Sequence, residues 1–330
     1  MSTRQNGKVS FGTLTLVILL FFGILFPLGA SVAAKKYLSL GTGSPAGTFY
    51  FIGAGFASIC NKYVPEVRVI AESTAASEEN FHLILRKKMD LGLVAINVLA
   101  PALEKKMDLS GVRLLALGHV SVRHWMVRRE SPVQSVSDFR GRKVAVGPPG
   151  SGTLVASRVA LTEVCGLPFD DFKPAYLSFT ESITALKDKT VEVGTIAAGY
   201  PVASVLELTR AHPIRLISHT EEEIKTLTTK YPYHVRAIIP KGTYPGIDTD
   251  TLSAGVQTAL FCRQDLSESL AYQLVKAIYD HPGEIGAIHP QAAQWNLENM
   301  FLGANYTTQH IPFHPGAVKY LKEKGVWKGR

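Results

Sequence analysis

The feature that most constrains the fold of this sequence is a repeated succession of a short apolar segment, a turn of small residues and a segment with helical periodicity. Residues 37–41 and 67–71 have the character of buried strands, and residues 53–63 between them place apolar side chains on one helical face. A helix with Ser77 as its N-cap continues the pattern, with acids in its first turn and bases at its end, as the helix dipole favours. The strand Leu91–Ile96 follows. Such alternation predicts an α/β architecture.

A second series of the same kind occupies the middle of the chain, which indicates two lobes rather than one. The β-rich stretch Leu114–Arg128 between the two series, and the later stretch Tyr231–Pro240, are predicted to carry the chain from one lobe to the other and back. We therefore expect residues 35–122 and 237–330 to form one lobe and residues 123–236 the other. Two hinge strands would then join the lobes across a ligand cleft.

The first 34 residues have the pattern of a secretory signal peptide. Two basic residues precede an uncharged apolar run over residues 11–26, and a group of small residues follows it. We expect cleavage after Ala34, with Ala33 as an alternative, and export to the periplasm. An uncleaved membrane anchor is the other possibility, because about 17 apolar residues are just enough to span a bilayer.

Four loops follow predicted strands at the edge where open α/β sheets bind ligands. Two of them, residues 41–50 and 147–153, are rich in glycine and precede helices, so backbone N–H groups there can approach an anion. Neither has the spacing of a nucleotide-binding phosphate loop. From the four loops the sequence predicts ligand contacts at Ser44, Thr48, Tyr50, Ser73, Thr74, Gly150, Ser151, Thr153, Gly199 and Tyr200.

Each of these loops also has a purely structural interpretation. The first can be a tight turn, Ser151 or Thr153 can be only a helix N-cap, and Tyr200 can pack at the rim of the cleft. Arg123 and Arg128, beside the first crossover, are candidate partners for a ligand carboxylate, because a guanidinium can donate two parallel hydrogen bonds to one. Either arginine can instead be a solvated surface residue.

Composition and spacing argue against several other classes of function. The net charge of +8 comes from 35 basic and 27 acidic residues that are scattered along the chain, so no nucleic-acid-binding stripe is expected. The histidines are dispersed and no H-E-x-x-H or G-x-S-x-G motif occurs, so no catalytic residue, metal site or cofactor is predicted. Cys60, Cys165 and Cys262 are widely spaced, which favours buried free thiols, although one pair can form a disulfide.

Taken in order, these loops and several later segments resemble the TAXI subfamily of solute receptors for TRAP (tripartite ATP-independent periplasmic) transporters. The resemblance covers almost all of the chain beyond position 34 and is carried by Gly41–Tyr50, Ser77–Asn80, Lys143–Gly147, Gly150–Thr153, Leu177–Phe179, Ala198–Pro201, Lys241–Gly246 and His314–Ala317. It implies a type II periplasmic-binding-protein fold that closes on a ligand and delivers it to a permease driven by an ion gradient.

The chain departs from that family at two places. Ala95, Ile96 and Asn97 stand where relatives often carry Gln, Ala and Asp before the first crossover, and the resemblance places a ligand contact at Asn97. Ser44-Pro45-Ala46 stands where relatives tend to carry further Gly or Thr. Both differences bear on which ligand is bound.

The sequence therefore predicts an extracytoplasmic receptor, not an enzyme, whose partners are a small solute and TRAP permease subunits. The solute is expected to be anionic or zwitterionic and to carry a carboxylate, as organic acids and amino acids do. The rival among binding proteins is a sensor subunit that presents the solute to a membrane signalling kinase. From another class, an exported enzyme on the same fold is the alternative.

Overall fold

The fold is described from a computed structural model, which covers residues 1–3, 34–301, 304–327 and 329. The chain divides into two units, Met1–Ala34 and Lys35–Arg330. Residues 4–33 of the predicted signal peptide lie outside the described residues, so the signal peptide stays a prediction. Within the covered ranges, the structure contains no helix with both the length and the apolar character needed to cross a membrane.

The first part of the second unit forms one side of a sheet. Its elements are β1 (Lys36–Gly41), α1 (Thr48–Tyr63), β2 (Val67–Glu72), α2 (Ser77–Leu85), β3 (Leu91–Ala95) and α3 (Leu99–Glu104). β1 pairs in parallel with both β2 and β3, so the carboxyl ends of the three strands meet at one edge. All of β3 is buried, as expected of a parallel strand covered on both faces.

Two long strands connect this part to the rest of the molecule. They are β4 (Val112–Arg128) and β10 (Thr251–Arg263), which pair with each other in antiparallel fashion. One end of β10 also pairs with β3, and the other end of β4 pairs with β7 (Gly194–Ala198). The sheet therefore runs in the order β2-β1-β3-β10-β4-β7.

The middle of the chain forms a second set of elements. They are β5 (Lys143–Ala145), α4 (Gly152–Arg158), β6 (Lys173–Ala175), α5 (Phe179–Lys187), β7, α6 (Ala203–Ala211), β8 (Ile214–Leu216), α7 (Glu221–Lys230) and β9 (His234–Ile239). β5 and β6 pair in parallel, β8 pairs with β4, and β9 pairs with the first half of β10. Capping boxes at Ser178 and Thr220 satisfy N–H groups at the starts of α5 and α7.

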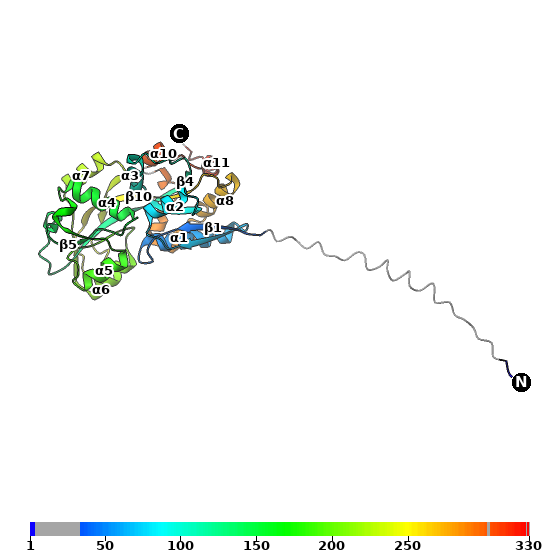
Figure 1. Ribbon diagram of the computed structural model, residues 1–330, viewed down its shortest axis with the longest axis horizontal. Helices are drawn as coiled ribbons and strands as arrows, with labels where there is room; N and C mark the ends of the chain where they lie inside the picture. The colour runs from blue at the N-terminus through cyan, green and yellow to red at the C-terminus, as the bar shows by residue number, and fades with distance from the viewer. Residues whose placement is uncertain (4–33, 302–303, 328, 330) are drawn as a thin grey trace. The chain divides into compact units, whose positions relative to one another are not determined.

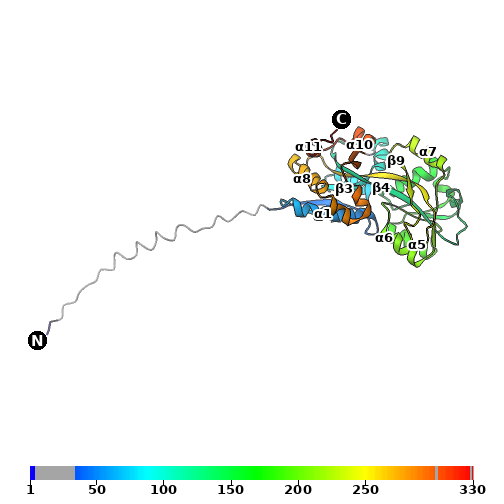
Figure 2. The same ribbon diagram turned by 180° about the vertical axis from the view of Figure 1, so that it is seen from behind.

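After β10 the chain returns to the first set of elements. It forms α8 (Glu268–Tyr279), α9 (Pro282–Ile288), α10 (Ala304–His310) and α11 (Pro315–Glu323). In both views of the molecule α5, α6 and α7 lie on one side, and α1, α8 and α11 lie on the other (Figures 1 and 2). Elements from the beginning and from the end of the chain thus lie on the same side of the molecule.

The buried apolar side chains confirm this division into two lobes. The largest cluster joins residues 38–117 with residues 256–321 and also includes Tyr233, and we call this part lobe 1. The other clusters use residues 122–254, which we call lobe 2. The clusters separate inside β4 and inside β10, so these two strands are the links between the lobes.

Four details differ from the sequence-based expectation. α1 begins at Thr48 rather than near residue 53, so part of the predicted loop is helical. Ala76, not Ser77, is the N-cap of α2, and the Ser77 hydroxyl instead accepts a hydrogen bond from the N–H of Ala95. α6 begins at Ala203, two residues after Pro201. The stretch predicted as the return crossover forms β9, whereas β10 makes the return.

Candidate ligand-binding site

A cavity of about 170 Å³ lies between the two lobes. Lobe 1 contributes the loops after β1 and β2 and the end of β3, and lobe 2 contributes the starts of α4 and α5 and the end of β7. The linking strands β4 and β10, together with β9, complete the wall. Seven residues predicted from the sequence line it, namely Ser44, Thr48, Thr74, Asn97, Arg123, Ser151 and Thr153.

One wall of the cavity is a set of side chains on a single face of the sheet. Val256 of β10 pairs with Ser121 of β4 on one side and with His234 of β9 on the other. Side chains alternate between faces along a strand, so Arg123 and Ala254, two positions along their strands, point the same way. All five residues line the cavity. Strand register alone therefore brings an arginine and a histidine to the ligand space.

Arg123 is the most unusual residue of the site. Its side chain is 3% exposed, and its Nε and Nη1 have no hydrogen-bond partner among the described residues. The guanidinium lies over the ring of Trp125, with its carbon 5.1 Å from the ring centroid. Burial lowers the pKa of Arg123 to about 10, so the group stays charged at neutral pH. The cavity thus holds a buried positive charge whose N–H groups are free to donate.

His234 lies beside this charge and is also unpaired. Neither of its ring nitrogens has a hydrogen-bond partner among the described residues, although the residue is buried. Burial and then the positive charge of Arg123 lower the pKa of His234 to about 3. A neutral imidazole offers one donor and one acceptor, so His234 can bind a ligand without adding charge.

Asn97 lies in the short 3-10 turn after β3 and is fully buried. Its Nδ2 donates to the carbonyl oxygen of Gly152, at 2.9 Å, which joins lobe 1 to the start of α4. Its Oδ1 has no partner among the residues that the structure describes. The amide therefore presents an unused acceptor at the cavity wall.

The start of α4 contributes Ser151 and Thr153, which are both nearly buried. Ser151 is the N-cap of α4, because its hydroxyl oxygen accepts from the N–H of Leu154 at 3.1 Å. Its own O–H donates to the carbonyl oxygen of Pro148 at 2.7 Å. The structural interpretation of Ser151 is therefore correct, and the residue also lines the cavity.

Several hydroxyls of lobe 1 are already engaged. Thr48 donates to the carbonyl oxygen of Gly199 at 2.7 Å, and Thr74 donates to Oδ1 of Asn80 at 2.7 Å. The first of these bonds crosses from lobe 1 to lobe 2, as does the bond from the N–H of Glu79 to the carbonyl oxygen of Gly150, at 3.0 Å. The lobes thus make direct contact around the cavity.

Six other predicted residues are not part of the lining, and two of them are glycines that hold the lobes together. The carbonyl groups of Gly150 and Gly199 accept the bonds from Glu79 and Thr48. Ser73 donates to the carbonyl oxygen of Gly43 at 3.0 Å, and Arg128 donates to the carbonyl oxygens of Leu186 and Val191 at 3.1 Å each. The other two are Tyr50, half-buried on α1, and Tyr200, which packs on the core of lobe 2.

Sequence reasoning missed several residues that the fold brings to the cavity. His234 was placed in a crossover stretch but carried no motif, Ser121 was only part of a predicted β-rich stretch, and Ala254 and Val256 were not singled out. Phe179 reaches the cavity from the start of α5. The available signal was the two-residue spacing of Ser121 and Arg123, which places both on one face of a strand.

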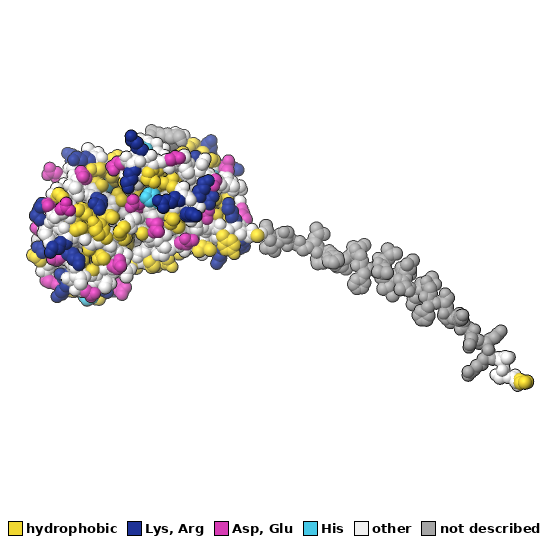
Figure 3. Space-filling view, viewed as in Figure 1, with side chains coloured by type: hydrophobic (Ala, Val, Ile, Leu, Met, Phe, Trp, Pro, Cys, Tyr) yellow, Lys and Arg dark blue, Asp and Glu magenta, His cyan; other side chains and the backbone are white. Residues whose placement is uncertain are grey.

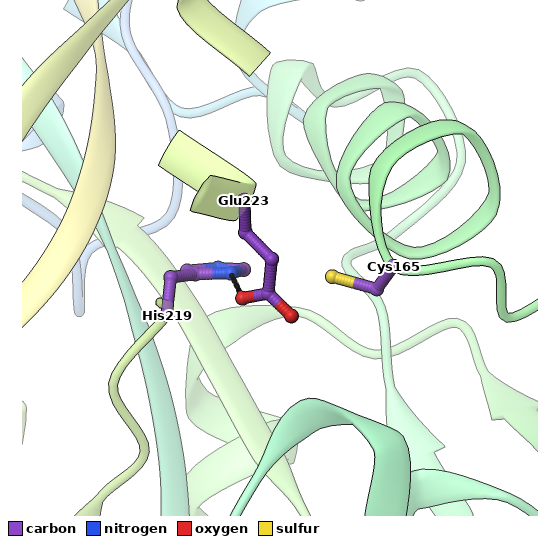
Figure 4. A group of neighbouring side chains, drawn as sticks. All are labelled: Cys165, His219 and Glu223. Carbon is purple, nitrogen blue, oxygen red and sulfur yellow. Dashed lines mark hydrogen bonds and ion pairs between the residues drawn. The ribbon is translucent and has the colours of Figure 1, made fainter. Parts of the chain in front are cut away.

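Behind Trp125 lie three side chains of the types that can bind a metal ion. Cys165, His219 and Glu223 place their ligand-type atoms within 4.8 Å of one another (Figure 4). Trp125 Nε1 donates to His219 Nε2 at 3.2 Å, so the ring proton is on Nδ1, which lies 3.0 Å from Glu223 Oε2. Burial and the neighbouring Glu223 raise the pKa of Cys165 to about 12. The three side chains thus form a hydrogen-bonded network with Trp125.

The cysteines follow the prediction in part. Cys60 and Cys262 are buried free thiols, as expected, whereas Cys165 is partly exposed. The histidines beside the first crossover, His119 and His124, are fully buried and hydrogen-bonded to Trp295 and Tyr244. They are core residues outside the lining of the cavity. On the face shown in Figure 3, basic and acidic side chains are interspersed.

Comparison with known proteins identifies the family of this chain. Residues 40–325 match the model of a family described as the NMT1-like family. Among solved structures, a protein from Bordetella bronchiseptica RB50 is 16% identical, with 87% of this chain and 89% of that chain covered and a TM-score of 0.52.

Two further solved structures are of transporter components. The periplasmic sulfonate-binding protein SsuA from Methylobacillus flagellatus KT is 16% identical, with 90% and 97% covered and a TM-score of 0.50. A binding protein component of an ABC phosphonate transporter from Pseudomonas aeruginosa is 13% identical, with 79% and 80% covered and a TM-score of 0.50. At these identities the likeness shows the fold, and it confirms the predicted two-lobed periplasmic-binding-protein-like fold.

Proposed function

The chain belongs to the NMT1-like family, and we propose that it is a solute-binding receptor that closes its two lobes on a small anion and delivers it to a membrane transporter. Structures that share its fold include a sulfonate-binding protein and a phosphonate-transporter component, which supports a transport role. The ligand is held by non-covalent contacts, and the protein is a receptor rather than an enzyme.

The single observation that carries this proposal is the buried, unpaired guanidinium of Arg123. Moving a charge out of water costs several kcal/mol unless an opposite charge and hydrogen bonds compensate. No Asp or Glu is among the residues that line the cavity. A carboxylate or similar oxyanion would supply the missing charge and accept from Nε and Nη1, which is the usual bidentate geometry of arginine.

Neutral groups complete the proposed anion site. Ser44, Thr48, Thr74, Ser151 and Thr153 surround the cavity with hydroxyls. Alanines together with Phe49, Phe179 and Val256 form much of the remaining lining, so the non-ionic part of the ligand is small and largely apolar. The hydroxyls of Thr48, Thr74 and Ser151 already donate within the protein. A carboxylate-bearing metabolite fits this arrangement of one cation among neutral polar groups.

The transporter that receives the solute is proposed to be a TRAP permease driven by an ion gradient. The resemblance of the loops at 41–50 and 147–153 to TAXI receptors supports this assignment. Two of the solved structures with the same fold, those from Methylobacillus flagellatus KT and Pseudomonas aeruginosa, are of ABC transporter components, and such transporters use ATP. Uptake of the solute by cells that express the receptor and its neighbouring permease should stop when an ionophore collapses the gradient and should continue when ATP is depleted.

The rival role is a sensor subunit that presents the solute to a membrane signalling kinase. In that case deletion of the gene would abolish a transcriptional response to the solute and leave its uptake intact. Loss of uptake is the result that the receptor role predicts.

The proposal also includes a compartment and a division of the chain into lobes. The N-terminal segment, residues 1–34, is proposed to be a signal peptide that exports the chain to the periplasm. The sequence places the lobes at residues 35–122 with 237–330 and at residues 123–236. We propose to move the return link to Gly255 of β10, because the clusters of buried side chains change there. N-terminal sequencing of the mature protein tests the cleavage site.

Binding to purified protein tests the proposal most simply. The protein is unfolded and refolded to remove any co-purified solute, and isothermal titration calorimetry is carried out with small carboxylates, sulfonates and phosphonates. Binding of at least one anion that is lost in Arg123→Met and kept in Arg128→Met is expected, because only Arg123 lines the cavity. Equal affinity in both variants would refute the assignment.

A further inference from the structure

The unused acceptor of Asn97 carries information about the ligand that the charge of Arg123 does not. The orientation of the Asn97 amide is fixed, because only an N–H₂ group can donate to the carbonyl oxygen of Gly152. The opposite end of the amide, Oδ1, is therefore an acceptor. It is buried, borders the cavity and has no partner among the described residues.

A buried acceptor of this kind is costly when it is unpaired. The Ser77 hydroxyl, which also lines the cavity, accepts a hydrogen bond from the N–H of Ala95 at 2.9 Å, and no hydrogen bond joins it to Asn97 Oδ1. No described residue donates to Asn97 Oδ1, so a donor on the ligand would satisfy this acceptor. A ligand that satisfies both groups combines an anionic group for Arg123 with a hydrogen-bond donor for Asn97.

The common hydrogen-bond donors on small organic acids are an ammonium and a hydroxyl. An ammonium brings a second charge into a cavity whose lining contains no Asp or Glu. It would also lie in the same small cavity as the cationic guanidinium of Arg123, which repels it. A hydroxyl needs one acceptor and no counter-charge, and Asn97 Oδ1 provides that acceptor.

We propose that the ligand is a hydroxy acid, whose anionic group binds Arg123 and whose hydroxyl donates to Oδ1 of Asn97. The inference rests on the proposed function, because it takes the same cavity to be the solute site. His234, neutral and with both nitrogens unpaired, binds the anionic group or the hydroxyl oxygen through its single N–H. Amino acids, which the sequence left as candidates, are excluded by this arrangement.

The test uses sets of acids that differ only in one substituent. One set consists of butanoate, 2-hydroxybutanoate, 3-hydroxybutanoate and 2-aminobutanoate. The second set consists of 4-methylpentanoate and its derivatives with the same substituents. Ethanesulfonate, 2-hydroxyethanesulfonate and 2-aminoethanesulfonate form a third, which distinguishes a carboxylate from a sulfonate. Each is titrated calorimetrically into protein that is expressed from the full-length sequence and freed of co-purified solute by unfolding and refolding.

In at least one set the hydroxy acid should bind about tenfold or more tightly than both its deoxy and its amino counterpart, as expected for one well-made hydrogen bond. Asn97→Leu removes the acceptor and should abolish that preference. Because the same substitution also removes the bond to Gly152, it can weaken all ligands together, so the readout is the ratio of affinities. Asn97→Asp supplies a counter-charge and should shift the preference towards the amino acid.

The possible failures are distinguishable. Equal affinity for the hydroxy and deoxy acids, or tightest binding of an amino acid by the unmodified protein, overturns this inference while the anion receptor stands. Binding that is unaffected by Arg123→Met, or no binding of any of these acids, overturns both the inference and the proposed function.

Discussion

Replacing Arg123 by Met should make the protein more stable and unable to bind its solute. The pKa of Arg123 is lowered from 12.5 to about 10, which corresponds to about 3 kcal/mol that disfavours the charged form in the folded state. Below pH 10 the arginine is charged in both folded and unfolded chains, so the full penalty applies at neutral pH. Loss of the contact with Trp125 offsets about 1 kcal/mol of the gain.

The net expectation is an increase of about 2 kcal/mol in the free energy of unfolding of the ligand-free protein. For a folded unit of about 300 residues this corresponds to a rise of about 3 °C in Tm. The assay is thermal and urea unfolding of the refolded protein without solute, with binding followed by calorimetry. Arg123→Lys is a second variant, which keeps a buried charge and should therefore not gain stability.

Arg128→Met is the matched control. Arg128 lies on the same strand but donates to two carbonyl oxygens outside the cavity, so its loss should lower stability and leave binding unchanged. An Arg123→Met protein that is less stable than the parent, or that binds the solute as tightly, would refute the view that Arg123 is a buried charge whose counter-ion is the ligand.

Three further predictions concern the rest of the molecule. Thr153→Val should weaken solute binding by about 1 to 3 kcal/mol if the buried hydroxyl contacts the ligand, and unchanged affinity in calorimetry would rule that contact out. Ser151→Ala removes the N-cap of α4 and should lower the free energy of unfolding by about 1 kcal/mol in urea titrations. Burial lowers the pKa of His119 and His124 to about 3 and about 4, so the unfolded chain takes up protons first as the pH falls. Stability should then decrease from about pH 6.5 to pH 4, by about 2 kcal/mol for each histidine at pH 5, and equal stability at pH 5 and pH 7 would contradict this.

The fold could be predicted from the sequence because it depends on patterns within short segments of the chain. Each strand and helix of the first series has its own apolar pattern, and parallel pairing of β1 with β2 and β3 follows from the α/β alternation. The lobe links were harder to predict. The first half of β10 alternates polar and apolar residues as many strands do, but no local pattern marks where a strand passes between lobes, and the return to lobe 1 was placed in the neighbouring strand β9.

The site was predictable where it depends on loops and not where it depends on strand pairing. Ser44, Thr74 and Ser151 lie in or beside glycine-rich or polar loops at strand ends, and all three line the cavity. His234 is brought to Arg123 by the register of β9 on β10 and of β10 on β4, which no local pattern encodes. Tyr200 was expected beside the ligand, but the wall at β7 is formed by the strand's own alanines, Ala197 and Ala198.

The central claim, that the cavity is an anion site closed by two lobes, is tested most directly by thermal unfolding of the refolded protein with a panel of small acids. A solute at one hundred times its Kd stabilises the folded state by about 2.7 kcal/mol, or about 4 °C in Tm for a unit of this size. The account predicts such a rise for selected anions, and its absence in Arg123→Met. A rise for uncharged sugars alone, or an equal rise in the variant, would contradict it.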